Sequence, residues 1–198
     1  MPVSQKIIRS LRETKVAVIH PQDEDGQNLS LQLRRIGCHL TSIWPPPRRM
    51  PSDVDAIFFL ADPDQVTALD WLEDERSCAL IAIIAYENPL ILETIASATI
   101  HGVIAKPIRT FGVLACLVTA LSLYKYETTL ISRIAKLDET LKTRRIVEKA
   151  SRILAGGRGI TEDDAYSVLR REAMNKQITL YEMATSIINA GSLLSKPE

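Results

Sequence analysis

The sequence predicts an α/β fold in which a doubly wound, five-stranded parallel sheet precedes a long helix and a small bundle of three helices. Two observations carry this prediction. Short runs of Val, Ile and Ala alternate with helical patterns over residues 15–104, and no proline interrupts residues 109–155. Continuous apolar runs suit strands that are buried on both faces, and their alternation with helices implies parallel strands joined by right-handed crossovers.

Five strands and three connecting helices are expected in the first part of the chain. The strands lie at residues 15–19, 39–43, 54–60, 79–84 and 102–104, and the helices at residues 28–36, 64–75 and 89–97. Gly37 directly follows the first helix, as glycine often does at a helix C-terminus. We therefore assign residues 1–108 to one α/β domain.

One long helix is expected from Arg109 to about Ala155. Within it, apolar residues recur at the two positions of a short a/d seam, which Glu127 and Arg144 interrupt. The seam residues are Leu123, Leu130, Ile134, Leu137 and Leu141. A helix packed against its own chain is the alternative. Because so long a helix would otherwise expose its apolar stripe, we expect residues 109–143 to form a coiled coil that makes a dimer.

Residues 144–198 are expected to form a compact helical module. The run from Gly156 to Gly159 should break the long helix, Thr161 should cap the next helix, and a last helix should cover residues 180–194. The residues expected to face inward are Ala165, Val168, Leu169 and Met174. So small a bundle suits surface binding better than catalysis.

Charge and cysteine usage limit the class of protein. The 24 basic and 24 acidic residues balance, but residues 125–198 hold 13 of the basic and only 10 of the acidic ones, which permits a polyanionic partner. Cys38, Cys78 and Cys116 lack the spacing of a zinc site or a disulfide framework, so buried free thiols are expected. No stretch reaches the roughly 18 apolar residues that span a bilayer, so we expect a soluble, cytoplasmic protein without membrane contact.

No set of residues indicates catalysis. The three histidines, His20, His39 and His101, are scattered along the chain. Neither a phosphate-binding loop, a dinucleotide-binding glycine motif nor a nucleophile motif occurs. The sequence therefore predicts a protein that is not an enzyme and that holds no metal or cofactor.

The α/β part resembles the receiver domain of bacterial response regulators, which has a CheY-like (flavodoxin-like) fold. The resemblance rests on the order of strands and helices and on His101-Gly-Val-Ile-Ala-Lys106-Pro107. In that family the lysine contacts a phosphoryl group on an aspartate at the end of the third strand, beside a metal held by an acidic pair after the first. Here His20 stands where the acidic pair belongs, and Leu60 stands at the phosphoacceptor position.

These departures imply a pseudo-receiver that signals without aspartyl phosphate. The remnant of the pocket comprises His20, Leu60, Lys106 and Pro107. We expect a nearby carboxylate to neutralise the Lys106 ammonium. The alternative is a phosphorylation-responsive regulator with a displaced acidic pocket, although magnesium needs well-aimed carboxylates. The candidate carboxylates are Asp23, Glu24, Asp25, Asp62 and Asp64.

The C-terminal part resembles the ANTAR domain, the RNA-binding module of AmiR/NasR-type transcription antiterminators. The matching segments include Arg144-Arg-Ile-Val-Glu-Lys-Ala-Ser-Arg-Ile-Leu154, Ile160-Thr-Glu-Asp-Asp-Ala-Tyr166 and Leu169-Arg-Arg-Glu-Ala-Met174. The sequence departs from the family pattern at Ser151 and Ala155, where lysine and methionine are usual, and at Arg152, where a small residue is usual.

The resemblance implies an RNA-binding surface with cations for the phosphates and a close-fitting surface for unstacked bases. The candidate residues are Arg144, Arg145, Lys149, Arg152, Ala165, Tyr166, Arg170, Arg171, Met174 and Lys176. Tyr181 is a second candidate for stacking on a base. Solvated charges paired with Glu148, Glu162 and Glu172 are the alternative interpretation of the cations.

Further motifs, above all Trp44-Pro-Pro-Pro47, extend the resemblance to the AmiR/NasR family along nearly the whole chain. This loop is stiff, and it has either a packing role or a role in docking a partner protein. It comprises Trp44, Pro45, Pro46 and Pro47. The resemblance implies a homodimer that binds stem-loops of a leader transcript and prevents terminator formation, under the control of an amide-sensing partner of the periplasmic-binding type. A protein-interaction scaffold that does not bind RNA remains an alternative.

Overall fold

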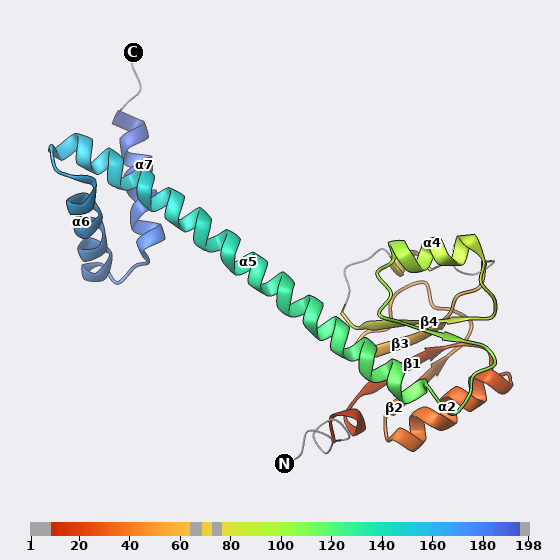
Figure 1. Ribbon diagram of the computed structural model, residues 1–198. Helices are drawn as coiled ribbons and strands as arrows, with labels where there is room; N and C mark the ends of the chain where they lie inside the picture. Colours follow the sequence, from red (N-terminus) through yellow and green to blue (C-terminus); the bar gives the residue numbers. More distant parts are fainter. Residues whose placement is uncertain (1–8, 64–68, 73–76, 195–198) are drawn as a thin grey trace. The chain divides into compact units, whose positions relative to one another are not determined.

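A computed structural model describes residues 9–63, 69–72 and 77–194, and the chain divides into two compact units, Met1–Thr128 and Thr129–Glu198 (Figure 1). The first unit contains one parallel sheet with the strand order β2-β1-β3-β4-β5. The strands are β1 (Lys15–Ile19), β2 (His39–Ile43), β3 (Ala56–Leu60), β4 (Ala79–Ile84) and β5 (Gly102–Ala105). The predicted fold class is therefore confirmed.

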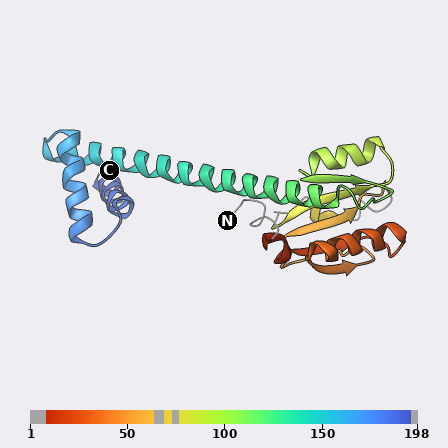
Figure 2. The same cartoon turned by 60° about the horizontal axis from the view of Figure 1, so that its bottom comes forward.

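Helices cover both faces of this sheet, as Figures 1 and 2 show. On one face, α2 (Glu24–Ile36) and the first turns of α5 (Val113–Arg158) pack through Leu29, Leu33 and Leu117. On the other face, α4 (Pro89–Ser97) and the 3-10 helix η1 (Asp70–Leu72) pack through Ile91 and Trp71. Strand β4, which lies between β3 and β5, is buried along its whole length, which explains its continuous apolar run.

Several predicted boundaries of the first unit are wrong. Helix α2 begins four residues before the predicted start, because the Asp23 carboxylate accepts a hydrogen bond from the Gly26 amide at 2.8 Å and caps the first turn. Strand β3 begins two residues late, at Ala56. Helix α5 begins at Val113 instead of residue 109, after Gly112 with its left-handed φ of 107°. Of the helix predicted at residues 64–75, residues 64–68 and 73–75 lie outside the described part of the chain.

The second unit consists of the remainder of α5, α6 (Glu162–Asn175) and α7 (Leu180–Leu194). The run from Gly156 to Gly159 ends the long helix as predicted, but only at its last residue, because α5 continues to Arg158, three residues beyond the predicted end at about Ala155. A glycine within a helix costs only about 1 kcal/mol relative to alanine, so packing can override it. The helix ends where Gly159 adopts a φ of 66°. Thr161 caps α6 as predicted, since its hydroxyl accepts a hydrogen bond from the Asp164 amide at 3.1 Å.

The three helices of the second unit enclose a small core. Its buried residues include Val147, Ala150, Leu169, Ala173, Met183 and Ala184. Ala165 and Leu169 are buried as predicted and Val168 is half-buried, but Met174 is 70% exposed. The inward position in this last turn belongs to Ala173, four residues after Leu169, so the predicted placement of Met174 is wrong.

The structure also shows the state of the cysteines and the character of the helices. Cys38 and Cys78 are buried and Cys116 is half-buried, and all three are free thiols. In the described ranges, no helix combines the length and apolar character needed to cross a membrane.

Candidate nucleic-acid interface

The last turns of α5 carry a row of cations on one exposed face. Arg145, Lys149 and Arg152 are exposed and are spaced by four and three residues, so they are neighbours on the helix surface. Val147 and Ala150 are buried on another face of the helix, where they contribute to the core with α6 and α7. The row, Arg145/Lys149/Arg152, is therefore open to a ligand without any rearrangement of the core.

Helix α6 carries a second exposed row. Tyr166, Arg170 and Met174 follow one another at intervals of four residues and are all exposed. Arg171 is exposed on a different side of the helix, and Lys176 is its C-terminal cap residue. An aromatic ring beside cations is what a protein needs to stack on an unpaired base and hold its phosphates. Ala165 is fully buried, so we assign it to the core and not to a contact surface.

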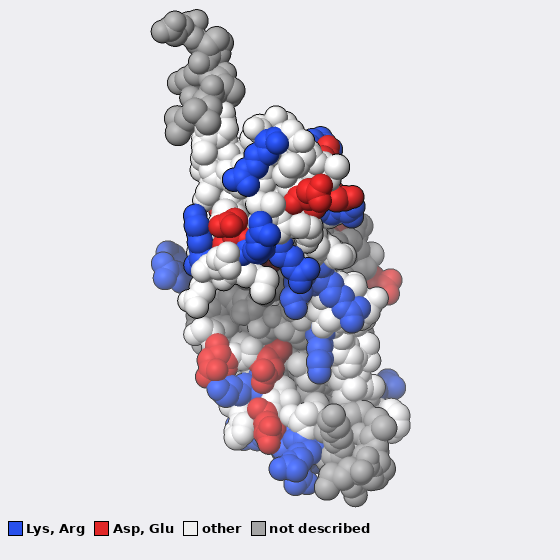
Figure 3. All heavy atoms as spheres, turned by 90° about the vertical axis from the view of Figure 1, so that its left-hand side faces the viewer, with Lys and Arg blue, Asp and Glu red and all other residues white. Residues whose placement is uncertain are grey.

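Some of these cations already have acidic neighbours. Arg144 donates from Nε to the Glu148 carboxylate at 2.9 Å, and Arg152 Nε lies 3.7 Å from the Glu162 carboxylate. Both pairs are exposed, and such pairs contribute about 0–1 kcal/mol, so a phosphate can compete for either arginine. Figure 3 shows Lys and Arg side chains with Asp and Glu side chains among them on the side that it draws.

After the first turns of α5, the apolar stripe of this helix is exposed. Side chains earlier on the helix, such as Val113, Leu117 and Ala120, are buried in the first unit. The five seam residues expose between 37% and 65% of their surface, namely Leu123, Leu130, Ile134, Leu137 and Leu141. Large apolar side chains at heptad spacing on an exposed helix indicate a surface that pairs with another helix.

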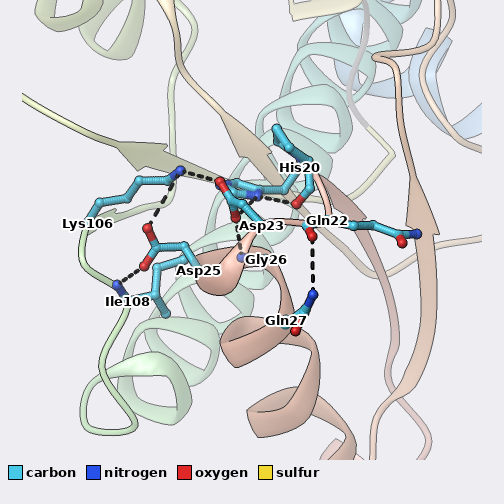
Figure 4. A network of polar contacts seen from close by, with 9 residues as sticks. His20, Gln22, Asp23, Asp25, Gly26, Gln27, Lys106 and Ile108 are labelled. Carbon is cyan, nitrogen blue, oxygen red and sulfur yellow. Dashed lines mark hydrogen bonds and ion pairs between the residues drawn. The ribbon is translucent and has the colours of Figure 1, made fainter.

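Hydrogen bonds and ion pairs connect the residues of the receiver-type pocket to one another (Figure 4). The buried ring of His20 follows β1, and its Nδ1 donates to the Pro21 carbonyl at 2.8 Å. A Cβ atom on Gly26 would lie 2.8 Å from this nitrogen and closer still to the Pro21 carbonyl oxygen, so only glycine fits beneath the ring. No sequence pattern signals this contact, because it depends on how α2 meets the end of β1.

Lys106 is held by two carboxylates of the same network (Figure 4). Its Nζ lies 3.3 Å from Asp23 Oδ2 and 3.7 Å from Asp25 Oδ2, and Asp25 also accepts a hydrogen bond from the Ile108 amide at 2.6 Å. The prediction that a carboxylate neutralises Lys106 is confirmed. Burial alone would raise the pKa of Asp23, but the Gly26 amide, His20 and Lys106 together lower that pKa below its ordinary value.

The remaining residues of the pocket offer no replacement for the phosphoacceptor. Leu60 ends β3 and packs against the core, while Pro107 is exposed. Among the residues that the structure describes, no three His, Cys, Asp or Glu side chains come together as a metal site. Asp64, one of the candidate displaced carboxylates, lies outside the described residues.

The proline-rich loop after β2 is anchored at one end. The indole Nε1 of the buried Trp71 donates to the Pro47 carbonyl at 3.0 Å. Pro46 and Pro47 are half-buried, whereas Pro45 is exposed and Trp44 exposes 40% of its surface. One end of the loop is therefore packed, and the other end exposes an aromatic ring. The first end suits a packing role and the second suits the docking of a partner protein.

Comparisons with known proteins follow the same two-part division. Residues 14–121 match the family described as AmiR, N-terminal, and residues 135–188 match the ANTAR domain. The chain is 31% identical over 189 residues to the Aliphatic amidase regulator of Pseudomonas aeruginosa, covering 93% of this chain and 96% of that protein. It is 26% identical over 125 residues to the Transcriptional regulatory protein PdtaR of Mycobacterium tuberculosis, covering 63% of this chain and 61% of that one.

A solved structure agrees with the fold. The response regulator StyR matches 90% of this chain and 99% of its own with a TM-score of 0.52 at 14% sequence identity. The family match covers more than half of the sequence and the amidase regulator nearly all of it. The chain therefore belongs to the AmiR family of regulators, with an AmiR N-terminal domain followed by an ANTAR domain.

Proposed function

We propose that this chain is a dimeric antitermination regulator that binds RNA through its ANTAR domain. The observation that carries the proposal is the exposed row Arg145/Lys149/Arg152 within that domain. Its cations suit the phosphates of a stem-loop, while Tyr166 on α6 suits an unpaired base of the loop. Bound to a leader transcript, the protein would prevent the terminator hairpin from forming.

The dimer in this proposal forms through the exposed stripe of α5. Leu130 and Leu137 take d positions and Ile134 takes an a position of one heptad register. The same register places Arg133 at g and Asp138 at e, five residues later. In a parallel, in-register pair of helices, a g residue lies beside the e residue of the partner five positions on, so opposite charges would meet on both sides of the seam.

The signal in this proposal comes from a partner protein and not from phosphorylation. Leu60 has no group that accepts a phosphoryl, and Lys106 is already engaged by Asp23 and Asp25. A partner that senses an amide and covers the cationic row would withdraw the regulator from RNA by mass action. The exposed Trp44 end of the proline-rich loop is the surface that we assign to this partner.

RNA affinity measured across a series of salt concentrations tests the proposal. The probe is a transcript with two adjacent stem-loops, and the variant combines Arg145→Ala, Lys149→Ala and Arg152→Ala. The matched control removes three exposed cations of the first unit through Arg48→Ala, Arg49→Ala and Arg109→Ala. Each lost phosphate contact should make the negative slope of log K against log salt less steep by about 0.7–0.9, in the first variant only. A folded dimer that binds no RNA would leave the scaffold alternative standing.

A further inference from the structure

A groove of about 630 Å³ lies within the second unit, lined by the C-terminal half of α5 and by the first residues of α6 and α7. Its lining includes four carboxylates, from Glu139, Glu148, Glu162 and Asp163, and the guanidinium of Arg144. This excess of negative charge repels phosphate. The groove therefore suits a group that donates hydrogen bonds and not the backbone of a nucleic acid.

A buried, unpaired hydroxyl in the groove points to a ligand. Ser151 lines the groove and is only 4% exposed, and its Oγ has no hydrogen-bond partner in the part of the chain that the structure describes. A buried hydroxyl without a partner is unfavourable, so such a group calls for one from outside the chain. On the α6 side, the 43% exposed ring of Tyr166 offers a flat surface for stacking.

We propose that this groove receives an unpaired RNA base that carries an amino group: adenine, cytosine or guanine extruded from a loop. The inference rests on the proposed RNA-binding function. The amino group would donate to a carboxylate such as Asp163, Ser151 Oγ would bond the base edge, and Tyr166 would stack on the ring. Uracil has no amino group, and the two carbonyl oxygens that flank its single N3–H would face the carboxylates, so uracil should bind the groove more weakly than the other bases.

The position of the groove favours a base over a cationic protein segment. Arg152 belongs to the exposed cationic row, and its Nε lies 3.7 Å from the carboxylate of Glu162, a residue of the groove. Cations for phosphate and acceptors for an amino group are thus adjacent. A nucleotide needs both, because its phosphate and its base have opposite requirements.

Two substitutions test this inference on the full-length protein: Ser151→Ala and Asp163→Ala. The probes are hairpin RNAs with one common stem and loops made only of adenine, only of cytosine or only of uracil. Each substitution should weaken binding of the adenine and cytosine loops by about 10-fold, as expected for the loss of one hydrogen bond to a base, and should leave the uracil loop unchanged. Ser151→Ala should not lower the melting temperature, because it removes a hydroxyl that is unpaired in the free protein.

The charge control makes the result decisive. Glu87→Ala removes one exposed carboxylate of the first unit and should slightly strengthen binding of all three loops. If Asp163→Ala behaves like this control, the groove proposal is overturned, although RNA binding by the domain stands. If Ser151→Ala and Asp163→Ala leave RNA binding unchanged and weaken only a complex with another protein, the groove binds a basic segment of that protein instead of an RNA base. An unmodified protein that binds none of the hairpins would overturn the proposed function together with this inference.

Discussion

The imidazole Nε2 of His101 donates a hydrogen bond to the carboxylate of Glu127 at 2.9 Å, which joins the start of β5 to α5. The direction follows from the other ring nitrogen, Nδ1, which accepts the Leu80 amide at 3.1 Å and so cannot carry the proton of a neutral ring. Glu127 interrupts the apolar seam of α5, and this hydrogen bond to His101 of the first unit explains why a carboxylate stands there.

Replacing Glu127 with leucine should affect the dimer and the first unit in opposite directions. Glu127→Leu fills an a position of the seam, so the dimer should dissociate less readily in sedimentation equilibrium. The same change leaves the buried His101 Nε2 without an acceptor, which should lower the free energy of unfolding by about 1–3 kcal/mol. Glu127→Gln retains an acceptor and serves as the control. Unchanged stability in Glu127→Leu would show that the contact contributes nothing.

The contacts of Asp23 predict how acid destabilises the first unit. The pKa of this carboxyl is lowered from 3.8, so its contribution to stability is present above that pH and is lost as the pH falls through the lower, folded-state pKa. Asp23→Asn keeps a cap for α2 but removes the attraction to Lys106 and His20, so its urea-unfolding stability should vary less with pH below about 4. Asp23→Ala should lose about 1 kcal/mol more at pH 7, because the cap is lost as well. Identical pH profiles for Asp23→Asn and the unmodified protein would contradict this role.

Much of the fold could be predicted because the sheet depends on local runs of apolar residues. Strands β1, β2 and β4 have the predicted ends. The errors lie where a tertiary contact or a single backbone angle decides: the cap at Asp23, the φ of Gly159, and the helical phase that buries Ala173 instead of Met174. The cationic residues of the candidate interface could be named from their motifs. The groove could not, because the burial of Ser151 follows from how three helices pack.

The cysteines should react slowly with thiol reagents in the folded protein. Burial, helped by the charge of Asp55, raises the pKa of Cys78 to about 11, and burial also raises the pKa values of Cys38 and Cys116. At pH 8 only about one Cys78 side chain in a thousand would be the reactive thiolate. Mass spectrometry of timed alkylation should therefore show Cys116, the half-buried one, modified first. Rapid labelling of Cys78 without unfolding would contradict the burial of this residue directly before β4.

Charges placed in the seam of α5 should separate the dimer and expose its role in RNA binding. Leu130→Asp with Leu137→Asp puts carboxylates at two d positions, so light scattering should give the mass of a single chain. Ser132→Asp lies outside the seam on the same helix and should remain dimeric.

The monomeric variant should bind one stem-loop as the unmodified protein does, because the module that contacts RNA is unchanged. It should lose the advantage of the dimer on a transcript with two stem-loops, where the second contact is intramolecular and can raise affinity by about 10²–10⁴. If the monomer binds the tandem transcript as tightly as the dimer does, the two modules do not act together. The dimer would then serve a purpose other than RNA recognition, and the exposed seam would have to be explained through the signalling partner instead.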